Sequence, residues 1–245
     1  MNAFLNEIRQ TLVPGRDGEH GPLPPLLIAM TLVTGLVDAF SYLVLGHVFV
    51  ANMTGNVVLL GFALIGAPGF SVAASVLAIA SFGLGALGGG IVGSRLDHRR
   101  DWLLSSAATI QVVLFTASVV FAASSGSPVG TGYRYSLIAV LAISMGIQNA
   151  AARKLAVPDL TTTVLTLTIT GIAADSVIVG GTGSKSGRRV ISAAAMLAGA
   201  VVGATFIVHS RIYYPLVIAL VVMALVAATT RILATPGAPW VRAGS

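Results

Sequence analysis

Cysteine is absent from this chain of 245 residues, and only 9% of its residues are charged. Without cysteine it forms no disulfide, no thiolate metal site and no cysteine nucleophile. Soluble domains carry about a quarter charged residues, so this chain lacks the polar side chains that a water-exposed surface needs. Because 56% of the residues are hydrophobic and the mean hydropathy is +0.92, the composition predicts a protein of the lipid bilayer.

Groups that would hold a metal or carry out catalysis are also scarce. The four histidines lie far apart without ligand spacing, and no single stretch holds paired carboxylates or a recognisable Ser/His pair. We therefore expect no enzyme, no metal site and no cofactor. The net charge of +6 comes from short basic clusters, not from a basic tract. It indicates membrane topology and gives no reason to expect a nucleic-acid partner.

Apolar runs of helical length fill most of the sequence, and breaks rich in Gly, Pro, Ser or charge separate most of them. They predict an all-α, polytopic membrane protein. Ahead of them, no basic segment leads into an apolar one, so we expect no cleaved signal peptide. Instead, Phe4, Leu5, Ile8 and Leu12 share a helical face, which predicts either a short interfacial helix or a disordered tail. The runs cover residues 25–46, 48–65, 71–94, 102–125, 135–152, 160–180, 190–210 and 213–232.

The second half of the chain repeats the first. GLVDA at 35–39 matches GIQNA at 146–150, VANMTGNVVL at 50–59 matches VPDLTTTVLT at 157–166, and GALGGGIVG at 85–93 matches AMLAGAVVG at 195–203. The offsets are 111, 107 and 110 residues. Three matches in the same order predict two repeats of four runs each. The predicted parts are a cytoplasmic tail or interfacial helix (1–24), a first membrane repeat (25–125), a linker (126–134), a second membrane repeat (135–233) and a C-terminal tail (234–245).

The distribution of positive charge selects among topologies, because Lys and Arg prefer the cytoplasmic side. If all eight runs crossed the membrane, the 14 Lys and Arg would divide 8 to 6 at best. If the second and sixth runs instead enter and leave on the same side, the division is 12 to 2, with only Arg134 and Arg211 outside. This favours six spans plus two re-entrant or broken segments, with both termini cytoplasmic. Seven spans, dividing the charges 10 to 4, and eight spans remain alternatives, because runs of this length can cross a bilayer.

Under the six-span topology the two repeats have opposite orientations, a design typical of transporters. Their second runs carry the polar stretches NMTGN (52–56) and PDLTTT (158–163). Non-helical backbone at membrane depth is tolerated only within protein or along a water-filled cavity. The stretches therefore either line a solute or ion site or hold helices together through Asn and Thr side chains.

Carboxylates inside the predicted spans are the other candidates. Asp38 lies in the first run and matches Asn149 in the repeat, and Asp175 lies in the sixth run. A buried carboxylate is costly unless it is paired or protonated. Each of the two therefore either takes part in proton coupling or braces the helix bundle through hydrogen bonds.

Small residues recur every four positions in two runs, as in membrane helices that approach closely. We expect them to pack between the two repeats or between protomers of a homo-oligomer. They are Ser81, Gly85, Gly89 and Gly93, and Ala195, Gly199 and Gly203.

Two stretches carry a family resemblance. GLVDAFSYLVLGHVFVANMTGNVVLLG (35–61) and MGIQNAAARKLAVPDLTTTVLT (145–166) resemble the YoaK-like family of bacterial integral membrane proteins, a family of unknown function. The resemblance extends over residues 27–230 and implies a helical protein of the bacterial inner membrane, with no substrate or mechanism. The matching residues are Asp38, Phe49, Asn52, Thr54, Gly55 and Asn56 in the first stretch, and Gln148, Asn149, Asp159 and Thr161 to Thr163 in the second.

Two functional hypotheses follow. The first is a transporter or channel for a small solute, with or without proton coupling, whose site lies between the inverted repeats. The alternative is a non-transporting scaffold or accessory subunit. Transport predicts a polar cavity that reaches the candidate residues, whereas a scaffold predicts that they are dry and hydrogen-bonded to one another. Those residues are Asp38, Asn52, Thr54, Asn56, Gln148, Asn149, Thr161, Thr163 and Asp175.

Overall fold

The computed structural model describes residues 2–13, 18–96, 98–125, 129–158, 160, 162, 165–174, 186–235 and 237–242. These residues form helices and connecting segments, with no β-strand among them. The long helices are α2 (Leu23–Val44), α4 (Val72–Arg95), α5 (Arg100–Ser124), α6 (Thr131–Leu155), α8 (Ser186–Val208) and α9 (Tyr214–Leu233). The shorter elements are α1 (Asn2–Leu12), α3 (Met53–Leu64), α7 (Leu165–Ala174) and the 3₁₀ turn η2 (Pro239–Val241).

Six helices in the described part of the chain are long and apolar enough to cross a membrane. They have 20 to 25 residues each, and about 20 residues cross the hydrocarbon core. The predicted all-α, polytopic fold is confirmed. In contrast, α3 has 12 residues and α7 has 10, or about 18 and 15 Å at 1.5 Å per residue. Six helices of the described part of the chain are therefore candidate spans, the number that the charge distribution favoured, and neither α3 nor α7 as described is long enough to be another.

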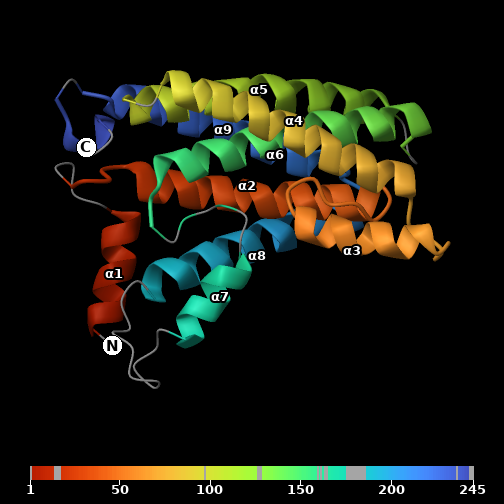
Figure 1. The fold of residues 1–245 in the computed structure, drawn as a ribbon, viewed down its shortest axis with the longest axis horizontal. Helices are drawn as coiled ribbons and strands as arrows, with labels where there is room; N and C mark the ends of the chain where they lie inside the picture. The colour runs from red at the N-terminus through yellow and green to blue at the C-terminus, as the bar shows by residue number, and fades with distance from the viewer. Residues whose placement is uncertain are drawn as a thin grey trace.

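The two repeats run in opposite directions (Figure 1). Helices α2, α5 and α8 start at the end of the molecule where α4, α6 and α9 finish, so the first repeat begins at one end and the second at the other. Helix α1 also lies at the end where α2 starts, which we call the basic end. Of the described Lys and Arg residues, ten lie at the basic end and two, Arg134 and Arg211, lie at the opposite end.

The main helix contacts each join a helix of the first repeat to a helix of the second. Helix α2 packs along α8, and α4 packs along α6, while α5 packs against α9. Glycines bring the backbones together: a Cβ added to Gly85 would lie 2.1 Å from the Ile143 carbonyl oxygen, and one added to Gly199 would lie 2.0 Å from the Leu32 carbonyl oxygen. The helix faces formed by small residues on α4 and α8 therefore pack against helices of the other repeat.

These contacts also give the register of the repeat. Gly89 approaches Ile147 and Ala150, and Gly203 approaches Leu36 and Ala39, the equivalents of those two residues at an offset of 111. Gly89 therefore corresponds to Gly203, and Gly85 to Gly199, at an offset of 114 residues. The offset of 110 expected from the sequence is wrong by one helical turn, because small residues spaced by four match equally well when shifted by four.

The amino-terminal segment is helical, and α1 packs against α8 and α2. Glu7 Oε2 on α1 accepts a hydrogen bond of 3.0 Å from the Gly187 backbone N–H. An acidic side chain at a helix N-terminus is favourable, because the N–H groups there lack partners and the helix dipole is positive. This contact helps to fix α1 against the first turn of α8.

Candidate solute site between the two repeats

After α2 ends, the chain turns back along that helix. The Asp38 side chain binds this returning non-helical segment by hydrogen bonds. The Val50 and Ala51 N–H groups donate to Asp38 Oδ1 at 3.1 and 2.9 Å. Asp38 lies six residues before the end of α2, so the returning segment reaches about 9 Å back from the helix end. The Asp38 side chain is 8% exposed. Its carboxylate thus supplies the acceptor that this non-helical backbone lacks at membrane depth.

Two asparagines complete the turn into α3. Asn56, fully buried, accepts from the Phe49 N–H at 2.9 Å and donates to the Phe49 carbonyl at 2.6 Å, so its amide pairs with both polar groups of one residue. Asn52 caps α3, accepting from the Gly55 N–H at 3.1 Å. The NMTGN stretch is therefore the start of a short helix whose asparagines satisfy the interrupted backbone.

Gln148 joins the two repeats directly. Its Nε2 donates to the Met30 carbonyl at 3.2 Å and to Thr34 Oγ1 at 2.9 Å, and the residue is fully buried. Polar side chains commonly tie membrane helices together in this way. Gln148 therefore connects α6 to α2 and is not a lining residue of the cavities described next.

A cavity of about 570 Å³ lies where the repeats meet. Its polar lining comes from Asn52 and Thr54 at the start of α3, Asn149 on α6 and Thr166 on α7. Apolar residues complete it, and none of the described lining residues is ionised. The volume lies within the range of small-molecule sites, about 300–1,000 Å³. The apolar part includes Ala51, Met53, Val58, Phe82 and Met196.

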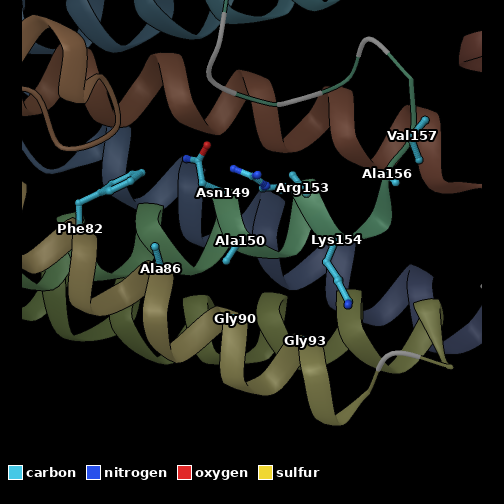
Figure 2. Close-up of a pocket in the computed structure, with 11 residues that line it drawn as sticks. Phe82, Ala86, Gly90, Gly93, Asn149, Ala150, Arg153, Lys154, Ala156 and Val157 are labelled. Atoms are coloured by element: carbon cyan, nitrogen blue, oxygen red, sulfur yellow. The ribbon is translucent and has the colours of Figure 1, made fainter.

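A second cavity, of about 830 Å³, adjoins the first and is directed toward the basic end. Both cavities are lined by Phe82 and Asn149. Figure 2 shows these side chains, from α4 and α6, pointing into the same space, with Arg153 one helical turn further along α6. Lys154, Ala156 and Val157 also line this cavity, so it extends to the end of α6. Phe82 and Asn149 therefore form the junction between the basic end and the inter-repeat cavity.

Comparison with known proteins gives the family. The profile of the family described as "Protein of unknown function (DUF1275)" matches residues 26–229. The chain belongs to this family. It is also 36% identical over 155 residues to the UPF0700 transmembrane protein YoaK of Bacillus subtilis (strain 168), an alignment that covers 61% of this chain and 65% of that protein. The expected YoaK-like membership is confirmed. No solved structure matches the chain.

In this DUF1275 protein, three of the nine candidate residues predicted from sequence line the inter-repeat cavity: Asn52, Thr54 and Asn149. Asp38, Asn56 and Gln148 instead hold backbone and helices in place. The remaining three lie outside the described residues: Thr161, Thr163 and Asp175.

Sequence reasoning did not identify Phe82, Met196 or Thr166 as lining residues. Phe82 and Met196 occupy equivalent positions of the two repeats, because they are 114 residues apart on α4 and α8. As apolar side chains in apolar helices they resemble residues that contact lipid. The sequence alone would have identified Phe82 and Met196 as equivalent residues only if the offset of 114 residues between the glycines of α4 and α8 had been known.

Proposed function

We propose that this protein is a membrane transporter or channel for a small polar solute, which binds in the cavity between the inverted repeats. The observation that carries the proposal is the cavity itself, which takes its lining from α3, α4, α6, α7 and α8 and thus from both repeats. Sites at the junction of inverted repeats, built where helices are interrupted, recur in transporters. The cavity offers hydroxyl and amide groups and no described ionised side chain, which suits a neutral polar solute.

A difference between the repeats supports a cycle of alternating access. In the first repeat the segment after α2 is seated on it, with Leu45, Val48 and Val50 buried. In the second repeat a cavity of about 830 Å³ opens beside the end of α6, where Ala156 lines it, although Val157 and Leu160 are buried as Val50 is. If the repeats exchanged these conformations, the entrance beside α6 would close and an equivalent one would open beside α2, at the opposite end.

In that exchanged state Asp38 would occupy the lining position that Asn149 has here, because the two residues are equivalent. A proton-coupled cycle would then use the Asp38 carboxylate, released from the Val50 and Ala51 N–H groups. By the positive-inside rule, we assign the basic end to the cytoplasmic side of the bacterial inner membrane.

Single cysteines in this cysteine-free chain test the proposal without a known substrate. Ala150 lines the cavity toward the basic end and also contacts Gly89, while its equivalent Ala39 contacts Gly203 and lines neither of the two cavities described above. A membrane-impermeant thiol reagent should modify Ala150→Cys from the cytoplasmic side in inverted vesicles. It should modify Ala39→Cys more slowly, and from the outside of right-side-out cells.

Two outcomes would count against these ideas. If Ala150→Cys in folded protein reacts from neither side, the cavity is closed to water and the transport proposal fails. If Ala150→Cys reacts but Ala39→Cys stays protected from both sides, alternating access fails and a channel or one-sided pocket remains. Osmotic swelling of proteoliposomes in glycerol, urea or alanine supplies the corresponding flux measurement, with protein-free liposomes as the control.

A scaffold or accessory subunit is the second candidate, and it is favoured by the internal hydrogen bonds of Asp38, Asn56 and Gln148. It predicts protection of both cysteines and no solute flux. Among the described residues, no group of three or more His, Cys, Asp and Glu could hold a metal ion.

A further inference from the structure

Arginines gather around two small cavities at the basic end, away from the inter-repeat site. One cavity, of about 350 Å³, is lined by Arg99 and Arg231, and the other, of about 190 Å³, is lined by Arg99 and Arg242. Both are lined by Ala234 as well. The three arginines come from the start of α5, the last turn of α9 and the segment after η2. They form one continuous basic recess, which we call the arginine recess.

The charge of the arginine recess is positive even after its internal ion pair is counted. Arg99 pairs with the buried carboxylate of Asp101 through bonds of 3.0 and 2.8 Å. This interaction raises the pKa of Arg99 above its ordinary value, so the guanidinium stays charged at every physiological pH. Arg231 donates at 3.4 Å to the neutral Thr109 hydroxyl. Among the described residues of the recess, Arg231 and Arg242 thus leave about two positive charges for an anionic ligand.

Apolar surface continues from the arginine recess along the two helices. Trp102, which lines the recess, is 54% exposed, and further along α5 Val113 is 63% exposed. On α9, Ile232 and Leu225 are 77% and 61% exposed. Trp102 and Val113 are 11 positions apart and Leu225 and Ile232 are seven apart, spacings that keep each pair on one helical face. The recess therefore adjoins apolar surface at Trp102 on α5, and on α9 Ile232 directly follows the recess residue Arg231.

We propose that the arginine recess binds the phosphate headgroup of an anionic phospholipid, whose acyl chains lie along the exposed faces of α5 and α9. Arginine guanidinium groups recognise phosphate oxygens through paired N–H donors, and basic pockets at the ends of membrane helices bind anionic headgroups. Trp102 sits where tryptophan side chains commonly occupy the boundary between headgroups and hydrocarbon. A soluble phosphate would use the same arginines but not the adjoining apolar faces.

Lipid titration of the purified, full-length chain by native mass spectrometry tests the proposal. The probes are dioleoylphosphatidylglycerol and, as the neutral comparison, dioleoylphosphatidylcholine. The test variant is the double substitution Arg231→Gln/Arg242→Gln, which leaves the Arg99–Asp101 pair intact. The matched control is Arg134→Gln/Arg211→Gln, which removes the same charge from the opposite end. Arg211 lies 5.5 Å from the Tyr214 ring, much as Arg99 lies 6.0 Å from the Trp102 ring.

The parent chain should bind phosphatidylglycerol more tightly than phosphatidylcholine. The test variant should lose about fivefold in affinity for each arginine removed, and the control variant should bind like the parent. Equal affinity for the two lipids, or an equal loss in both variants, would overturn the proposal. If millimolar inorganic phosphate displaces the lipid and binds as tightly alone, the recess is a soluble-anion site and the lipid assignment is wrong. Thermal unfolding of the variants without added lipid confirms that each one folds.

Discussion

Replacement of Gly85 by alanine should separate α4 from α6, and the cost can be estimated from the structure. The added Cβ would lie 2.1 Å from the Ile143 carbonyl oxygen and 2.8 Å from the Ile143 Cα. These are backbone atoms, so the helices must move apart by about 1 Å to restore normal contact. Overpacking of this kind costs about 1–3 kcal/mol. Alanine also favours the helix by about 1 kcal/mol relative to glycine, which partly offsets the cost.

Gly88 provides the matched control within the same helix, because a Cβ added there meets nothing within 4 Å. Gly88→Ala gains the same helix propensity without the clash, so the difference between the two variants isolates the backbone contact. We expect Gly85→Ala to have a free energy of unfolding lower than that of Gly88→Ala by about 1–3 kcal/mol. Reversible unfolding in mixed detergent micelles measures it. Equal stability of the two variants would show that α4 and α6 do not approach as described.

Three further comparisons between variants test other contacts. Gly199→Ala should be as destabilising as Gly85→Ala, since the two glycines are equivalent, and a mild effect at Gly199 alone would contradict the repeat register. Asp38→Leu leaves two buried N–H donors unpaired and should lower stability by at least about 2 kcal/mol, whereas Asp38→Asn keeps an acceptor and should lose less. Asn56→Ala should cost more than Asn52→Ala, whose loss of an exposed helix cap is worth about 1 kcal/mol; thermal unfolding of all four asparagine and aspartate variants decides both comparisons.

The span count could be predicted from the sequence because charge is a global constraint. Arg9, Arg95 and Arg188 can share one side of the membrane only if the second and sixth runs return to the side they entered from. Run length alone would have counted eight spans, since an apolar segment of 18 residues can be a span or a hairpin. The second run is resolved by α3, which has only 12 residues, whereas much of the sixth run on either side of α7 lies outside the described residues.

The roles of the polar residues were harder to predict. Asp38 binds the backbone after α2, and Asn149, at the equivalent position, lines a cavity. Whether a polar residue lines a cavity depends on how the segments around it pack, a tertiary property that residue type does not encode. The arginine recess was missed for a similar reason: Arg99, Arg231 and Arg242 are remote in sequence, and each alone resembles a topology signal.

Because the main helix contacts lie between the two repeats, they determine the order in which the protein assembles during synthesis. Helix α2 packs along α8 and α4 packs along α6, so each of these helices of the first repeat finds its main partner in the second. When the ribosome has completed only the first repeat, the faces of Gly35 and Gly85 have nothing to pack against and contact lipid instead. Assembly therefore waits for the carboxyl-terminal helices. Two separately synthesised halves carry complementary faces, so the protein should be able to form from two chains inserted in opposite orientations.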